Sequence, residues 1–515
     1  MKLFKKSYIA LIGLSITAFS ACSDQIFTEI NTDPNNPTTV ATTSLLVSGQ
    51  KQALNAIRSE SIHLRGAQLF AQYYAQNIYT DQSRYLIPVD YAGSFWNSAY
   101  LSLNTFNEII KLNSDESTKA IASAGTAGTN ANQIAIARIL KSYVFHNLTD
   151  VFGNIPYESY GNKDADFEAL QQAPDILTPK YASQQKIYAD ILNELDQAAD
   201  TLYKYQTQRT FGASDIIYKG DNSKWYKFAN SLRLRLANRI LAKEPAVAKQ
   251  HIEDALAQGV FTTNSDNAVF KYSTNSPNEA PLFRATVIAN RKDFAVSNVI
   301  VEALSGRRGP FTHADPRLEK YANPNEAGDY VGQPYGLPLE AGNIFPYNRI
   351  SLPGSILNAA DYAEVLQEYA EVEFLIAEYK NWDQSHYEKG VKASLEKWGI
   401  TAAAFQDYIN SLPSANQETV LTQKYFALYG QGIEGWSELR RTGYPNFIVK
   451  KGDLLWSGTV GGTPKTYYFE PEVGNAVPSR LTYPLKEQST NRSNYQQALS
   501  EQGDDIINTK IWWNK

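Results

Sequence analysis

The side chains that most often carry out catalysis are present in this chain, but not at the spacing of any known catalytic motif. The five histidines are far apart in the sequence: His63, His146, His251, His313 and His386. The chain has no HExxH zinc motif, no GxSxG nucleophile elbow, no phosphate-binding P-loop and no GxGxxG between a strand and a helix. This pattern favours a binding protein over a hydrolase that uses a metal ion or a nucleophilic side chain.

Carboxylates keep one enzymatic alternative open, because glycoside hydrolysis needs only two acids at a suitable separation. The candidate pairs are Asp164/Asp166, Glu371/Glu373 and Asp504/Asp505. Another set of acids falls at helical spacing and is predicted to form the solvated face of a helix: Glu364, Glu368 and Glu371. A surface glycoside hydrolase therefore remains an alternative that rests on composition alone.

Aromatic side chains are the other group with a chemical use. The chain has 33 Tyr and 8 Trp, and residues 73–100 interleave aromatics with Asn77, Asp81, Arg84 and Asp90. Flat rings with a polar edge suit surfaces that stack on sugars or grip peptides, although they also suit ordinary helix packing. We expect most of these rings to be structural and a minority to face a ligand.

The N-terminus has the order of a lipoprotein signal. Lys2, Lys5 and Lys6 precede an uncharged stretch over residues 8–20, and Cys22, the only cysteine of the chain, follows Ala21. We therefore expect a signal peptide over residues 1–21, then an acylated Cys22 and a polar tether that together cover residues 22–42. Acylation would anchor the chain to a lipid bilayer. Phe19 departs from the aliphatic residue usual in such signals.

Net charge and residue spacing bear on two further kinds of partner, nucleic acid and metal ions. The formal net charge is −5, and it becomes more negative once the signal lysines are removed, so nothing favours nucleic-acid binding. Asp81, Asp329 and Asp361 could join loop carbonyls around a structural calcium ion, but no EF-hand spacing supports such a site. We predict no cofactor.

Periodicity predicts helices as the elements that position these groups. Helical blocks are expected over about 43–260 and 361–442, with Ser183 as an N-cap and with Trp225 and Phe228 as core anchors. Residues 261–360 and 443–515 are rich in Gly, Pro, Asn and aromatics, which suits loops and short strands. Residues 43–515 are therefore expected to form one mainly α domain with long irregular insertions, the segments that usually carry function.

A series of motifs, in order along nearly the whole chain, resembles the SusD/RagB family of outer-membrane lipoproteins. Among them are INTDPNNPT (Ile30 to Thr38), IARILKSYVFHNLTDVFGNIPYESY (Ile136 to Tyr160), KWYKFANSLRLRLANRI (Lys224 to Ile240), EGWSELRRTGYP (Glu434 to Pro445) and PSRLTYPLKEQSTNRSNY (Pro478 to Tyr495). The resemblance implies a scaffold of tetratricopeptide-like helix pairs with partly β insertions. It also implies a surface-exposed protein that is not an enzyme and that captures a nutrient oligomer for a SusC-like TonB-dependent transporter.

Analogy with family members places ligand contacts in an early loop and in the irregular middle region. It nominates Tyr79, Arg84, Tyr85, Tyr91, Trp96, Tyr330, Tyr335, Phe345 and Tyr347. The competing expectation, that Trp96 and most of these tyrosines pack the scaffold, carries equal weight for each residue. A glycan is the favoured cargo, and an oligopeptide is the first alternative. A helical-repeat scaffold that binds only proteins is a further alternative.

Overall fold

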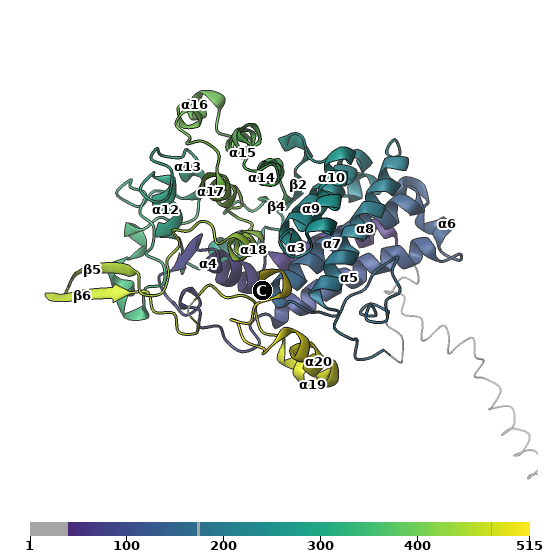
Figure 1. Cartoon of the computed structure of the whole chain (residues 1–515), viewed down its shortest axis with the longest axis horizontal. Coiled ribbons are helices and arrows are strands. Elements are labelled where there is room, and N and C mark those ends of the chain that lie inside the picture. Colours follow the sequence, from purple (N-terminus) through teal and green to yellow (C-terminus); the bar gives the residue numbers. More distant parts are fainter. Residues whose placement is uncertain (1–39, 172–175, 475) are drawn as a thin grey trace, which may run out of the picture.

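The computed structural model describes residues 40–171, 176–474 and 476–515, so the signal peptide, Cys22 and nearly all of the tether lie outside the described residues. Two groups of helices form the body, and irregular segments cover one end of it (Figure 1). Among the described residues, no helix has both the length and the apolar character needed to cross a bilayer.

The first group of helices is a chain of antiparallel neighbours. Each helix packs on the next, in the order α3 (Thr42–Ile57), α5 (Gly93–Ser114), α7 (Asn130–Phe152), α8 (Gln184–Lys204), α9 (Asn222–Ile240) and α10 (Pro245–Gln258). The helices pack in this way because each has an apolar face to bury. In helix α8 that face is a fully buried stripe of Ile187, Ile191 and Leu195. The hydroxyl of Ser183 accepts a hydrogen bond from the backbone N–H of Lys186, which confirms the predicted N-cap.

The second group of helices follows the irregular middle region. It comprises α14 (Tyr369–Tyr379), α15 (Gln384–Lys397), α16 (Ala402–Asn410), α17 (Gln417–Ala427) and α18 (Gly432–Thr442). Helix α14 packs on α15, α17 and α9, and α18 packs on α7 and α17, so the two groups share a core. The mainly α, paired-helix scaffold is thereby confirmed.

The predicted solvated face of Glu364, Glu368 and Glu371 is wrong. These residues do not share a helix, because Glu364 lies in strand β4 (Ala363–Gln367) and Glu371 in α14, and all three are buried. Cations from other parts of the sequence compensate their charge: Arg58 lies 3.0 Å from Glu364, Arg235 lies 2.5 Å from Glu371, and Lys397 pairs with Glu368. Buried carboxylates need such partners.

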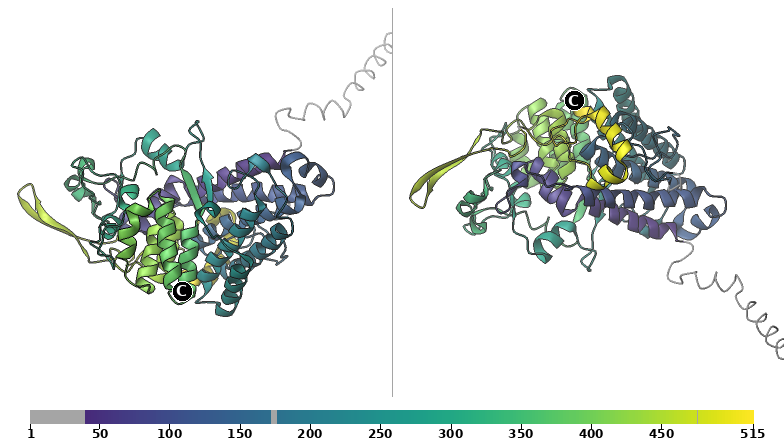
Figure 2. Two further views of the ribbon diagram at one scale, coloured as in Figure 1. Left: turned by 90° about the horizontal axis from the view of Figure 1, so that it is seen from above. Right: turned by 90° about the horizontal axis from the view of Figure 1, so that it is seen from below.

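Among the described residues, strands are short and occur as three antiparallel pairs, and two of the strands, β1 and β4, lie in blocks that were predicted to be helical. Strand β1 (Tyr74–Gln76) pairs with β3 (Phe294–Val296), β2 (Ala268–Lys271) pairs with β4, and β5 (Leu454–Val460) pairs with β6 (Thr463–Tyr468). The β5–β6 hairpin projects from the body (Figure 2). The β1–β3 pair joins the early loop to the middle region, more than 200 residues away, with Tyr74 opposite Val296.

Short helices occupy much of the remaining chain. They are α4 (Gln68–Phe70), α6 (Lys119–Ala122), α11 (Pro281–Phe283), α12 (Asn298–Leu304), α13 (Leu318–Tyr321), α19 (Leu485–Thr490) and α20 (Arg492–Gln502), with a π-helical segment over Glu60–Ala67. Helices α19 and α20 lie in a region for which only loops and short strands were expected. Their side chains are mostly exposed, and the inward face of α20 has only Tyr495, Ala498 and Leu499 as apolar residues, so its helical stripe is short.

A buried ionic cluster joins the central helices to the C-terminus. Arg239 of α9 lies 2.6 Å from Asp150 of α7 and also pairs with Glu434 of α18. Asp150 accepts further hydrogen bonds at 2.5 Å from the Tyr188 hydroxyl and at 2.9 Å from the Trp513 indole. The cluster fixes the relative positions of three helices and of the last residues of the chain.

Helix α7 begins at a cap that can be tested. The Thr129 hydroxyl accepts a hydrogen bond from the backbone N–H of Asn132, and Thr129→Ala is expected to lower the free energy of unfolding by about 1 kcal/mol. Thr401 precedes α16 with a similar extended backbone but caps no N–H group, so Thr401→Ala is the matched control. Denaturant midpoints measure both changes, and equal midpoints for the two variants would contradict the cap's contribution.

Candidate functional site

The β1–β3 pair places the loop after β1 against the irregular middle region, and a cleft lies between them. We call it the loop cleft. It consists of two adjoining hollows of about 360 and 690 Å³ that share Ile78 and Tyr347. The smaller hollow is further lined by Asn77, Leu339, Gly342, Asn343, Phe345 and Pro346, and the larger by Arg65, Tyr79, Asp81, Gln82, Asn290, Arg291, Lys292 and Asp293. Their combined size suits a ligand larger than a single monosaccharide.

Tyr79 is the most exposed aromatic side chain of the loop cleft. Its side chain is 67% exposed and its backbone has φ 56°, in the left-handed region that a bulky residue rarely adopts. Asn290, on the opposite segment of the larger hollow, also has a positive φ of 52°. Backbone strain of this kind concentrates at ligand sites, where the surrounding structure maintains it.

Tyr347 stands between the two hollows with one face available. It is half-buried, and burial, together with the nearby Asp293 carboxylate, raises the pKa of its hydroxyl, which therefore stays protonated at neutral pH. Phe345 lies two residues away on the wall of the smaller hollow. The loop cleft thus combines aromatic faces with a hydroxyl that can donate a hydrogen bond.

Asn77 supplies a polar group that lacks a partner. Its side chain is 3% exposed, and its Oδ1 atom accepts no hydrogen bond from the described residues. A buried acceptor without a partner costs free energy. The Oδ1 atom has no contact with solvent, so a hydroxyl or a water molecule could pair with it only after the side chain turns toward the hollow.

Arg291 forms a rigid wall of the larger hollow. Its Nε and Nη2 donate to the two oxygens of Asp293 at 2.9 and 2.6 Å, and its Nη1 donates to Glu60 at 2.6 Å. The hydrogen bonds to Asp293 raise the pKa of the guanidinium further above its usual value. A guanidinium held in this way presents a fixed planar edge to a ligand.

The acids of the loop cleft are engaged by arginines. Asp293 is held by Arg291 at both oxygens, and Asp81 lies 3.1 Å from Arg84. No histidine lines either hollow. An acid that is held in an ion pair is poorly suited to donate a proton.

The three aspartates proposed for a calcium site are not brought together. Asp81 pairs with Arg84, while Asp361 pairs with Lys271 at 3.2 Å. Within residues 40–171, 176–474 and 476–515, no group of three or more His, Cys, Asp or Glu is placed to hold a metal ion. Arg84 is only three residues from Asp81, whereas Lys271 is distant in sequence from Asp361 and is brought to it by the pairing of β2 with β4.

The structure brings three of the nine nominated residues together at the loop cleft: Tyr79, Phe345 and Tyr347. Two nominations are wrong, because Trp96 packs at 5.0 Å on Phe152 and Tyr335 packs at 5.8 Å on Phe469, both inside the core. A buried ring offers no face to a ligand.

The other four nominated residues also lie outside the hollows. Arg84 pairs with Asp81 and Glu472, and the Tyr91 hydroxyl donates to the Arg65 carbonyl at 2.7 Å. Tyr330 packs against the core, and Tyr85 is buried at the base of a separate cavity. Three further lining residues, Asn77, Asn290 and Arg291, were not among the nominated ligand contacts. Arg291 lies in a charged run of the irregular middle region, and that run could have indicated it.

Comparison with known proteins decides the family. A sequence profile of the SusD-like family described as "starch-binding associating with outer membrane" matches residues 34–484. The chain belongs to this SusD-like family. A SusD-like protein, P2, from Formosa agariphila is 22% identical over 281 residues, and that match spans about half of each chain, 50% of this one and 48% of the relative.

Solved SusD-like structures share the fold over nearly the whole chain. A chitin-binding protein matches with a TM-score of 0.72 at 25% identity, covering 92% of this chain and 100% of its own. A SusD homologue from Parabacteroides distasonis matches with a TM-score of 0.74 at 24% identity, covering 92% and 98%. A chitin-binding SusD homologue from Flavobacterium johnsoniae matches with a TM-score of 0.71 at 23% identity, covering 91% and 98%. The shared fold therefore extends over nearly the whole of this SusD-like chain, whose family is associated with the outer membrane.

Proposed function

We propose that this SusD-like protein is a surface lipoprotein of the outer membrane that captures an oligosaccharide in the loop cleft and delivers it to a SusC-like TonB-dependent transporter. Acylated Cys22 would be its anchor, and the protein would have no hydrolytic activity of its own. The observation that carries the proposal is the cleft itself, in which the exposed Tyr79 and the half-buried Tyr347 line adjoining hollows beside the polar side chain of Asn77.

The chemistry of the cleft supports a glycan cargo. Sugar rings present apolar C–H faces that stack on aromatic side chains, and their hydroxyls pair with amides, phenols and guanidinium groups. Two of the solved structures that share this fold are named as chitin-binding proteins, which makes oligomers of N-acetylglucosamine the first class to test. The larger hollow is lined mainly by polar and charged side chains, which suits the hydroxyl groups of an oligosaccharide.

Ligand-screening calorimetry of the soluble chain from residue 23 onward tests the proposal. We expect chitin or starch oligosaccharides to bind with a Kd in about the micromolar to millimolar range, and oligopeptides of similar length not to bind. Chromatography of the oligosaccharide after incubation should show no shortening. Binding of peptides alone would replace the glycan cargo with a peptide cargo, and failure of both classes would contradict nutrient capture.

A further inference from the structure

A second cavity, of about 470 Å³, lies between the C-terminal end of α18 and the base of the β5–β6 hairpin. We call it the basic pocket. Its base is apolar, because Val449, Phe469 and the ring of Tyr85 line it and each is at most 5% exposed. It shares no lining residue with either hollow of the loop cleft. Its volume falls within the usual range for small-ligand sites, about 300–1,000 Å³.

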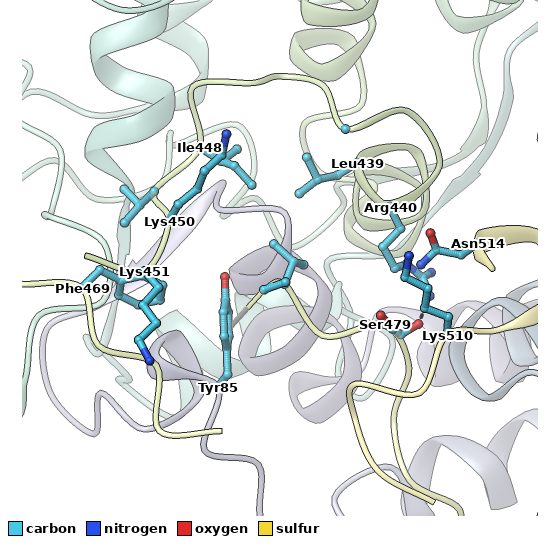
Figure 3. Close-up of a pocket in the computed structure, with 14 residues that line it drawn as sticks. Tyr85, Leu439, Arg440, Ile448, Lys450, Lys451, Phe469, Ser479, Lys510 and Asn514 are labelled. Carbon is cyan, nitrogen blue, oxygen red and sulfur yellow. Dashed lines mark hydrogen bonds between the residues drawn. The ribbon is translucent and has the colours of Figure 1, made fainter. Parts of the chain in front are cut away.

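Four basic side chains surround this apolar base. Lys450 and Lys451 lie on one side of Tyr85, and Arg440 and Lys510 lie on the other (Figure 3). No Asp or Glu is among the lining residues. Asp453 is the acid next to the pocket in sequence, and it accepts a hydrogen bond from the backbone N–H of Lys450 at 2.8 Å. The pocket therefore has an excess of positive charge over an apolar surface.

Lys450 and Lys510 are not committed to other contacts. Within the described part of the chain, neither Nζ atom has a carboxylate or a hydrogen-bond partner. Both side chains are exposed, so their positions can adjust to a bound molecule at little cost. Most other cations near the core are engaged, as Arg239 is by Asp150 and Glu434.

Arg440 is the fixed cation of the pocket. Its guanidinium donates to the carbonyls of Asp150 at 2.8 Å and Ser479 at 2.6 Å, and it stacks on Trp436 at 3.7 Å. Carbonyls and rings orient the guanidinium without neutralising it, and among the described residues it forms no ion pair with a carboxylate. Burial, assisted by the neighbouring charge of Arg239, lowers the pKa of Arg440 to about 9, so the group remains charged at neutral pH.

We propose that the basic pocket binds a small organic anion with an apolar body, of the aryl- or alkyl-carboxylate class. The apolar body would lie on Val449 and Phe469, and the carboxylate would face Arg440 and Lys510. A charge-assisted pair at the edge of a partly desolvated pocket is stronger than the same pair in open water. This ligand differs in charge and polarity from the neutral oligosaccharide proposed for the loop cleft, so the two sites are chemically independent.

The test compares 1-naphthoate with 1-naphthamide, its neutral counterpart of almost the same shape, by calorimetry on the purified full chain at neutral pH. We expect naphthoate to bind at least about tenfold more tightly than naphthamide. The double substitution Lys450→Met and Lys510→Met should weaken naphthoate binding at least about threefold and leave naphthamide binding unchanged, because Arg440 retains the rest of the preference for the acid. Lys465→Met, at an exposed lysine of β6 outside the pocket, is the matched control and should leave the affinity unchanged.

Two results would overturn the proposal. One is equal affinity for the acid and the amide, which would show that charge does not contribute. The other is an unchanged naphthoate affinity in the double variant, which would place the bound anion elsewhere on the protein. Oligosaccharide binding at the loop cleft should be the same in all these variants, so failure at the basic pocket is distinguishable from failure of the proposed nutrient capture.

Discussion

Arg239→Met is expected to lower the free energy of unfolding by about 3–5 kcal/mol. The side chain is 1% exposed, lies 2.6 Å from Asp150 and pairs with Glu434, and Glu438 is 3.5 Å away. Methionine retains much of the volume of arginine but no charge, so three carboxylates would stay buried without their shared cation. Chemical denaturation of wild type and variant measures the difference.

An exposed ion pair provides the control for this substitution. Lys119 lies 2.6 Å from Glu116 with both side chains exposed, at 42% and 86%, and Lys119→Met should change the free energy of unfolding by less than about 0.5 kcal/mol. Equal free energies of unfolding for the two variants would contradict the role of the buried cluster in holding α7, α9 and α18 together.

Trp225→Ala is expected to cost about 3–5 kcal/mol of stability. The indole is fully buried, contacts Tyr218 edge-on at 5.2 Å, and donates a hydrogen bond from Nε1 to Asp215 at 2.7 Å. Truncation leaves a cavity beside α9 and removes one donor from a buried carboxylate. The loss is measurable as a shift of the thermal or denaturant midpoint.

Trp456→Ala is the matched control, because Trp456 is a half-buried tryptophan on the projecting β5–β6 hairpin and contacts Tyr467 at 6.1 Å. Its removal should cost less than about 1 kcal/mol, since few core atoms lose a neighbour. A Trp456→Ala variant as unstable as Trp225→Ala would mean that the hairpin contributes to the core.

Local patterns predicted the scaffold well because helix packing depends on residues that are close in sequence. The stripe of Ile187, Ile191 and Leu195 is buried, and so are the predicted core anchors Trp225 and Phe228. Arg441 pairs at 2.7 Å with Glu438, three residues earlier in the same helix. These contacts all arise from the helical repeat, which the sequence displays directly.

Contacts between distant segments were not predictable in the same way. Glu371 has the spacing of a surface residue, but its partner Arg235 lies 136 positions away, and only the packing of α14 against α9 brings the two together. Arg440, in the last turn of α18, is a second example. Arg440 binds backbone carbonyls of Asp150 and Ser479 in place of the carboxylates that lie near it in sequence.

The candidate site was nominated by region, from the family resemblance and the aromatic content of the early loop, and its ligand contacts remain a prediction. The β1–β3 pair brings the early loop and the middle region together. Residue type alone could not separate Tyr79, which is 67% exposed, from Trp96, which is 5% exposed. Trp96 is buried because Phe152 and other core side chains cover its ring, and this covering depends on the tertiary structure.

The most direct test of glycan capture in the loop cleft is a calorimetric titration of one oligosaccharide that binds the wild type. The double substitution Tyr79→Ala and Tyr347→Ala removes two of the three aromatic rings of the cleft, and Tyr468→Ala removes an exposed ring from the hairpin, at 53%. We predict a loss of affinity of roughly tenfold or more in the cleft variant and no change in the hairpin variant. Unchanged affinity in the cleft variant, with the protein folded, would contradict the assignment of the loop cleft as the glycan site.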